Sequence, residues 1–254
     1  MTSPSGMLVV VADDFGADAR TNEAIAEAMR RGLISNASLL ANGAAFIEAC
    51  DIARREGWTD RVGIHLTVTE GPALSGPIRL CRRFCDDDGQ LWFSRFTHLR
   101  LSLAERTALT LEWQTQIDRC REAGIALSHA DSHHHAHAEF PLFSVLAPLL
   151  AETGIPYLRL SDNVRKTNWM RGLYKLLFNG SVDRAGLRGT DYFCDADGIG
   201  KIGKAAGKII EMMVHPAFDE AGDLIDSGTG RRLADCLPAG LRLGSFGDLQ
   251  RPGK

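Results

Sequence analysis

Runs of apolar residues with two kinds of spacing alternate along the chain and predict an α/β fold. Apolar runs of strand length lie at 7–12, 38–41, 61–68, 127–130, 157–160 and 212–215. Apolar residues at helical spacing predict helices over 21–31, 44–56, 104–123, 140–153 and 203–211. Strands that alternate with helices are typical of a parallel sheet covered by outer helices, and closure into a barrel is favoured over an open sheet. With no internal repeat or linker, one domain over residues 1–254 is expected.

Polar side chains stand where several of these predicted strands end. Asp13 and Asp14 follow the first strand, His65 lies within or at the end of the third, and His215 follows the last. Active sites of α/β barrels assemble at the carboxyl ends of their strands. We therefore expect these side chains to meet at one end of the fold.

A histidine run follows the fourth predicted strand. Five of the eight histidines fall within nine residues, at positions 129, 133, 134, 135 and 137. Imidazole is the commonest side-chain ligand for transition metals. The run is internal and interleaved with Asp131, unlike an expression tag. An extended backbone would place His129, Asp131 and His133 on one side. The residues alone leave open which histidines bind a metal and which only shape a pocket.

One carboxylate and two histidines form a ligand set that leaves coordination positions for water and substrate, as in metal hydrolases. Each residue also has a structural interpretation. Asp13 and Asp14 would serve as a helix cap and turn, His65 as a buried core residue, and His215, held extended by the following proline, as a turn residue.

Composition excludes several classes of protein. The 254 residues carry a net charge of −3 and are 44% hydrophobic, which gives no reason to expect a nucleic-acid partner. No apolar stretch approaches the roughly 18 residues of a transmembrane helix, and the start lacks the features of a signal peptide. Six scattered cysteines without a CxxC pattern are expected to be reduced, which favours the cytoplasm.

The segments 12–16, 63–66, 128–137, 214–218 and 242–249 together resemble the YdjC-like carbohydrate deacetylases in order and spacing over essentially the whole chain. The resemblance implies an irregular (β/α) barrel and a metal-dependent hydrolase that removes an N-acetyl group from an amino sugar. The implied substrate is a chito-oligosaccharide or a lipid-linked N-acetylglucosamine, since one branch of the family is associated with hopanoid biosynthesis.

The resemblance also implies roles for single residues. Asp14, His65 and His133 would hold a divalent cation, and the choice of His133 among the histidines depends on the resemblance alone. Asp13 would be the general base. His215 would give a proton to the leaving amine, and Arg159 would orient the base or the substrate. The family implies magnesium, whereas the two imidazole ligands favour zinc or another transition metal.

Residues 161–190 depart from the family pattern and combine six basic side chains with apolar ones such as Trp169 and Leu173. A basic amphipathic helix can lie on a membrane surface or cover a lipid-bearing substrate. The interpretation favoured here is a lid helix that packs its apolar face on the barrel. The expected partners are an N-acetylated sugar or glycolipid, a membrane contacted peripherally and a second copy of the chain.

Two other functions compete with deacetylation. The first is metal-dependent hydrolysis of a phosphoester or cyclic amide, often carried out with two cations about 3.5–4 Å apart. The second is a carbohydrate-binding protein that has lost catalysis. The presence of both Asp13 and His215 argues against this last alternative.

Overall fold

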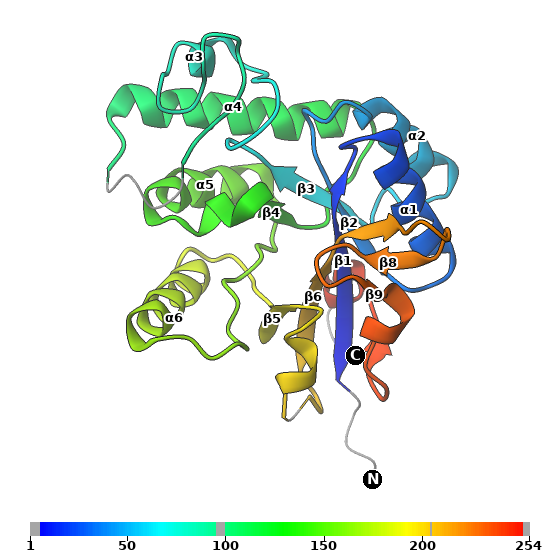
Figure 1. The fold of residues 1–254 in the computed structure, drawn as a ribbon. Helices are drawn as coiled ribbons and strands as arrows, with labels where there is room; N and C mark the ends of the chain where they lie inside the picture. The colour runs from blue at the N-terminus through cyan, green and yellow to red at the C-terminus, as the bar shows by residue number, and fades with distance from the viewer. Residues whose placement is uncertain (1–5, 95–99, 204, 251–254) are drawn as a thin grey trace.

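The computed structural model describes residues 6–94, 100–203 and 205–250. At its centre lies a seven-stranded sheet in which all neighbours run parallel, curled into a half-barrel (Figure 1). The strand order is β4-β3-β2-β1-β6-β5, and β10 also pairs with β1. These strands are β1 (Met7–Phe15), β2 (Asn36–Leu39), β3 (Val62–Leu66), β4 (Ala130–Ser132), β5 (Tyr192–Asp195), β6 (Ile209–Val214) and β10 (Arg242–Leu243).

The helices cover the outside of this sheet, which confirms the predicted α/β class with parallel strands and outer helices. They are α1 (Ala19–Arg30), α2 (Phe46–Arg55), α3 (Gly76–Arg79), α4 (Leu103–Glu122), α5 (Phe140–Thr153) and α6 (Trp169–Arg184). The short helix α7 (Phe246–Gln250) instead places Phe246 on the inner side of the sheet. Local chemistry sets several boundaries. Ser102 and Glu105 form a capping box that begins α4, and Gly154 ends α5 with a left-handed backbone at φ 71°.

An extended segment narrows the opening between the two edges of the half-barrel. The predicted strand 157–160 is present as single bridges, in which Leu158 pairs with β4 and Tyr157 with Arg188. Just beyond it, the side chain of Asn163 accepts a hydrogen bond from the backbone N–H of Phe193 in β5 at 2.9 Å. The two edges of the sheet are thus joined through residues 157–163.

The prediction of a helix over 203–211 is wrong. From 205 to 208 the described backbone forms turns and coil, and β6 begins at Ile209; residue 204 lies outside the described residues. This strand is a continuous run of isoleucine, methionine and valine that is interrupted only by the buried Glu211. The single carboxylate breaks the apolar run and hides the strand pattern. The short strand β5 is not predicted, because four residues give too little periodicity.

Alternate residues of β1 divide the core into two clusters. Leu8, Val10 and Ala12 face the helices, whereas Met7, Val9 and Val11 form a separate inner cluster. Phe246 of α7 and Tyr157 complete that inner cluster. The next inward position on β1 is Asp13, so the barrel interior changes from apolar to polar along the strand.

A small antiparallel sheet follows β6, with strands β7 (Pro216–Phe218), β8 (Leu224–Asp226) and β9 (Arg231–Arg232). Its β7 strand packs against α1. Asp226 accepts a hydrogen bond from the backbone N–H of His215 at 2.8 Å. The small sheet therefore fixes the backbone at the carboxyl end of β6.

His129 lies inside the barrel, against the inner cluster. Its ring stacks on Phe246 with 4.3 Å between centroids, and Gly63 leaves it room, since a Cβ there would lie 2.4 Å from the ring. Burial lowers the pKa of His129 to about 4, so the side chain is neutral in the folded protein. His129 is thus a core residue.

We predict that His129 makes the protein less stable in mild acid. The histidine of the unfolded chain takes up a proton below pH ~6.5, whereas the folded one does not, so its contribution is present above that pH and is lost as the pH falls. Between pH 7 and pH 5 the loss is about 2 kcal/mol. Chemical denaturation of His129→Phe, which keeps a ring on Phe246, should show a correspondingly smaller loss than the wild type. An identical loss in both proteins would contradict this assignment.

Candidate metal centre and active site

The two consecutive aspartates reach the same region because the strand that carries them is irregular. From Ala12 to Phe15, β1 uses three residues where β2 uses two, which is the register of a bulge. Asp14 has φ 67°, a left-handed conformation that is uncommon outside glycine. This backbone lets the side chains of Asp13 and Asp14 occupy neighbouring positions at the end of the barrel, where a regular strand would send them to opposite faces.

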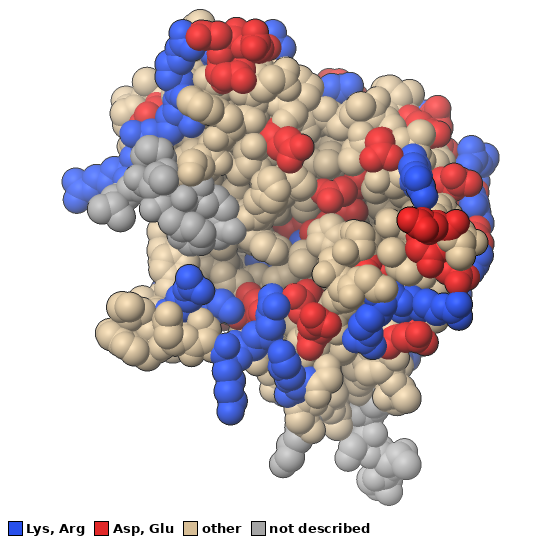
Figure 2. All heavy atoms as spheres, viewed as in Figure 1, with Lys and Arg blue, Asp and Glu red and all other residues tan. Residues whose placement is uncertain are grey.

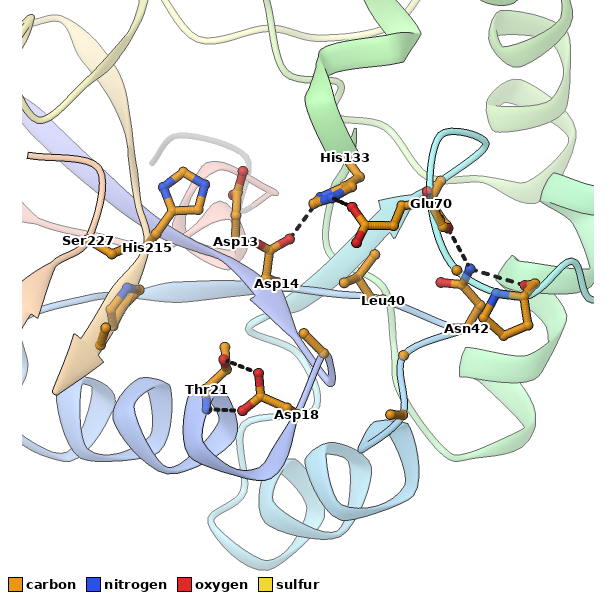
Figure 3. Close-up of a pocket in the computed structure, with 18 residues that line it drawn as sticks. Asp13, Asp14, Asp18, Thr21, Leu40, Asn42, Glu70, His133, His215 and Ser227 are labelled. Carbon is orange, nitrogen blue, oxygen red and sulfur yellow. Dashed lines mark hydrogen bonds and ion pairs between the residues drawn. The ribbon is translucent and has the colours of Figure 1, made fainter. Parts of the chain in front are cut away.

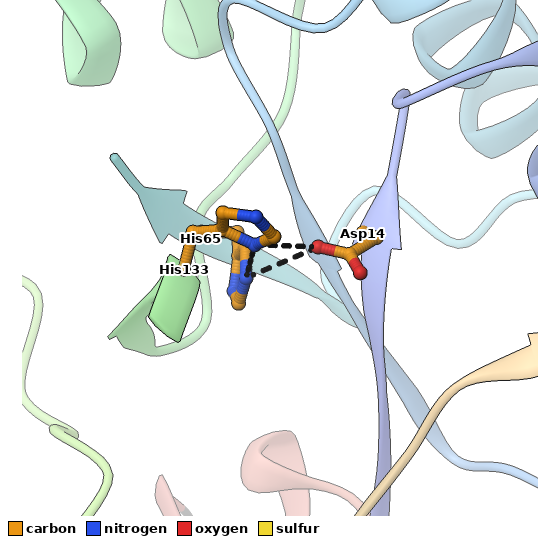
Figure 4. Close-up of side chains that lie close together, drawn as sticks. All are labelled: Asp14, His65 and His133. Atoms are coloured by element: carbon orange, nitrogen blue, oxygen red, sulfur yellow. Dashed lines mark hydrogen bonds and ion pairs between the residues drawn. The ribbon is translucent and has the colours of Figure 1, made fainter. Parts of the chain in front are cut away.

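Asp14, His65 and His133 converge on one point, although they come from β1, β3 and the turn after β4 (Figure 4). His133 Nδ1 lies 3.0 Å from Asp14 Oδ1, and His65 Nε2 lies 3.3 Å from both of these atoms. Ligands held at about 2.0–2.2 Å around one tetrahedral or octahedral cation lie about 2.9–3.5 Å apart. Within the described part of the chain, the buried Asp14 Oδ1 accepts no hydrogen bond of good geometry. The spacing and the donor types fit a divalent cation.

The far nitrogen of each imidazole is directed at a carboxylate. His65 Nδ1 lies 2.7 Å from Asp131 Oδ1, which also accepts a hydrogen bond from the Ser38 hydroxyl at 2.5 Å. His133 Nε2 lies 3.2 Å from Oε2 of the exposed Glu70. Such partners fix the tautomer and ring orientation of metal-binding histidines. With a metal ion bound, each ring would donate its N–H to this carboxylate and present a lone pair to the convergence point.

The electrostatics of this point favour a positive charge. Burial lowers the pKa of His65, but the carboxylates of Asp131 and Asp13 outweigh it and raise that pKa to about 10. Burial raises the pKa of Asp14, but the close imidazoles of His133 and His65 outweigh it and hold that pKa well below its usual range. The cluster is thus built to stabilise a cation, whether a proton on His65 or a metal ion.

Arg159 lies beneath the cluster and binds three carboxylates from three different strands. Its guanidinium forms two hydrogen bonds of 2.7 Å to Asp13, and it lies 2.6 Å from Asp131 and 2.6 Å from Glu211. All four side chains are at most 3% exposed. Burial raises the pKa of Glu211 to about 7 despite the neighbouring guanidinium. One arginine among three carboxylates leaves this layer short of positive charge.

The remaining histidines of the run have other surroundings. His137 is buried, its Nε2–H donates to the carbonyl oxygen of Arg159 at 3.1 Å, and its Nδ1 accepts from the Ser132 hydroxyl at 2.7 Å. Burial lowers the pKa of His137 to about 3, so it supports the Arg159 backbone as a neutral ring. His134 and His135 both have φ 53°, and the ring of His134 lies against the ring of His133 with 4.0 Å between centroids. Nδ1 of His134 lies 3.0 Å from the Thr69 hydroxyl. Glu70, His133 and His134 thus form a second, more exposed group that could hold a metal ion.

A cleft of about 460 Å³ opens above Asp13, Asp14 and His133 (Figure 3). His215 lines the same cleft at the end of β6, in a backbone position fixed by Asp226. The volume falls within the ~300–1,000 Å³ of small-molecule sites. Further polar groups on its walls are Asp18, Thr21, Asn42, Thr67, Glu70 and Ser227.

The structure brings all six sequence-predicted site residues to this end of the barrel. Asp13, Asp14, His133 and His215 line the cleft, His65 lies beneath it, and Arg159 is buried under Asp13. Sequence reasoning missed three residues that hold the site together: Ser38, Glu70 and Glu211. Of these three, only Glu211 could have been found from the sequence, as one charged residue inside a continuous apolar run.

Comparison with known proteins places the chain in a family. Residues 7–236 match the model of the YdjC-like protein family. A carbohydrate deacetylase of Listeria monocytogenes serotype 4b is 32% identical over 221 residues, which cover 83% of this chain and 81% of that protein. A carbohydrate deacetylase of Danio rerio is 30% identical over 76% of this chain and 62% of that protein. The chain belongs to the YdjC-like family.

Two solved structures share the fold. A candidate cellobiose-phosphate cleavage protein of Enterococcus faecalis superposes with a TM-score of 0.72 at 22% identity, over 96% of this chain and 99% of that one. A lactam utilization protein of Thermus thermophilus superposes with a TM-score of 0.50 at 14% identity, over 94% of this chain and 100% of that one. At these identities, the likeness concerns the architecture alone.

We predict that removing the buried guanidinium destabilises the whole protein. Arg159→Met leaves Asp13, Asp131 and Glu211 without their shared cation and should lower the free energy of unfolding by about 3–5 kcal/mol or more. Arg31→Met is the control, because Arg31 forms an exposed ion pair with Glu27, a kind of pair that contributes less than about 1 kcal/mol. Urea denaturation measures the free energy of unfolding of both variants. An equal decrease in the two would show that the buried cluster contributes no more to stability than an exposed ion pair.

Proposed function

We propose that this protein is a metal-dependent hydrolase that removes the N-acetyl group from an acetylated amino sugar. The observation that carries the proposal is the convergence of Asp14, His65 and His133 beside the carboxylate of Asp13, on the floor of a cleft. Family membership and the carbohydrate deacetylases among its relatives support the same reaction.

In this proposal Asp14, His65 and His133 hold one divalent cation. When bound, that cation polarises the acetyl carbonyl and makes a water molecule more acidic. Two imidazoles and one carboxylate suit zinc or another transition metal by ligand type, while the family resemblance implies magnesium. Metal reconstitution of the purified protein distinguishes these ions.

The proton transfers are assigned to two side chains that line the cleft. Asp13, held in one orientation by Arg159, takes a proton from the water molecule while the water oxygen bonds to the acetyl carbon. His215 then gives a proton to the amide nitrogen as the C–N bond breaks, so that acetate and a free amino sugar leave. The buried guanidinium is a positioning group in this scheme, because it touches Asp13 and lies beneath the cleft floor.

The sugar itself is proposed as a chito-oligosaccharide or a lipid-linked N-acetylglucosamine. Hydroxyl and amide groups on the cleft walls, such as Thr21, Asn42 and Ser227, are of the kind that hydrogen-bonds to sugar hydroxyls. Residues 161–190 are proposed to belong to the single domain, with the inner face of α6, at Tyr174 and Phe178, against the end of the histidine run. Hydrolysis of a phosphoester or cyclic amide is the competing reaction, and acetate release separates the two.

We predict that Asp13 and His133 fail in different ways when replaced. Asp13→Asn keeps all three proposed ligands but loses the base, so acetate release from N-acetylated chito-oligosaccharides should fall by ~10²–10⁴-fold while metal content stays unchanged. His133→Ala should lose the metal, measured by elemental analysis, and with it the activity. Chelation of the wild type should have the effect of His133→Ala.

Two matched variants control these results. Asp18→Asn removes a carboxylate from the wall of the same cleft but keeps a good N-cap for α1, so it should retain most activity. His134→Ala, next to His133, should retain the metal. If His134→Ala loses the metal while His133→Ala keeps it, the ligand assignment is wrong. If the metal-loaded wild type releases no acetate from any N-acetylated sugar, the proposed reaction is wrong.

A further inference from the structure

Helix α6 carries apolar side chains on two opposite faces. Phe178 and Val182 are buried and pack toward the barrel. On the other side, Trp169, Leu173 and Leu176 follow the i, i+4, i+7 spacing of one helical stripe. With the neighbouring Met170 and Leu177 they are between 48% and 76% exposed. The prediction that the apolar face of this segment packs on the barrel therefore holds for the inner face alone.

Much of the exposed apolar surface lies on this stripe, which consists of Trp169, Met170, Leu173, Leu176 and Leu177. Half of the ten large hydrophobic residues that are exposed in the described part of the chain belong to it. Single exposed apolar side chains are ordinary, whereas a contiguous group marks a surface that binds something. Figure 2 shows the uncharged surface over α6 at the lower left, with Lys and Arg side chains beside it.

The charges around the stripe are mostly positive. Residues 162–184 contain five basic residues and two acidic ones, Asp162 and Asp183, although the whole chain has a net charge of −3. Arg165 and Lys175 form ion pairs with Asp162. Lys166 and Arg171 take part in none of the ion pairs found among the described residues, so their charges are available to a partner.

We propose that α6 docks the protein on the surface of an anionic lipid membrane. The apolar stripe would enter the boundary between headgroups and acyl chains, with Trp169 at the level where tryptophan is favoured, and Lys166 and Arg171 would meet lipid phosphates. No helix in the described ranges is long and apolar enough to cross a membrane, so the contact is peripheral. A second copy of the chain fits less well, since a symmetric contact would bring each copy's basic residues together.

The docked helix would hold the candidate active site close to the membrane. The Tyr174 hydroxyl donates to the carbonyl oxygen of Ala138, at the end of the histidine run, at 2.8 Å. Phe178 contacts the ring of His137 with 6.0 Å between centroids. One helix diameter, about 10 Å, therefore separates the lipid from the segment that carries His133. The inference stands apart from the proposed reaction, because it concerns where the protein sits and not which bond it cuts.

The experiment is sedimentation of the full chain with vesicles of phosphatidylcholine alone or mixed with phosphatidylglycerol. The double variant Leu173→Glu/Leu176→Glu places two acids in the stripe. The control, Leu103→Glu, changes a leucine at the start of α4 that is more exposed than either of these two. Both variants are at the surface, so thermal unfolding should be unchanged, and acetate release from soluble chito-oligosaccharides should match the wild type. This last readout separates failure of membrane docking from failure of the proposed reaction.

We expect the wild type to bind mixed vesicles at least tenfold more tightly than neutral ones, and salt to weaken the binding. The double variant should lose at least tenfold in affinity, and Leu103→Glu should bind as the wild type does. Absence of wild-type binding to mixed vesicles, or equal binding by the double variant, would overturn the proposal. A dimer in light scattering that the double variant abolishes, without any vesicle binding, would assign the stripe to a second copy instead.

Discussion

The structure depends on one buried guanidinium. Arg159 joins Asp13 of β1, Asp131 of β4 and Glu211 of β6, so a single side chain connects strands from the middle and the edge of the half-barrel. Its two hydrogen bonds to Asp13 fix the proposed base, and its contact with Asp131 extends through His65 to the proposed metal. A buried charge is costly unless its partners are complete, which ties the site to the integrity of the barrel.

This arrangement follows from the alternation of side chains along the strands. The inward positions of β1 pass from Val9 and Val11 to Asp13, and those of the β4 region pass from His129 to Asp131 and then to His133. Along both strands, core side chains are thus followed by a charged layer at Asp13 and Asp131, and His133 beyond it lines the cleft. The layers that stabilise the fold therefore also hold the side chains of the candidate active site in place.

The sequence was sufficient for the order of most strands and helices and for the end of the fold where polar groups gather, because apolar runs and strand ends are local signals. It could not reveal the left-handed backbone of Asp14, nor the partner of each imidazole, since these depend on neighbours far along the chain. The sequence pattern puts Glu211 in a helix because an inward carboxylate interrupts an apolar strand. The ion-pair partner that stabilises Glu211 in this buried position is Arg159, which lies 52 residues away in the sequence.

The position of a bound ion tests the account most directly. Anomalous diffraction from crystals of the protein grown with zinc or manganese would locate it. The account predicts one ion about 2.0–2.2 Å from Asp14 Oδ1, His65 Nε2 and His133 Nδ1, with Asp13 still paired to Arg159. An ion held by Glu70, His133 and His134, or one that draws Asp13 away from Arg159 into its coordination sphere, would contradict the account.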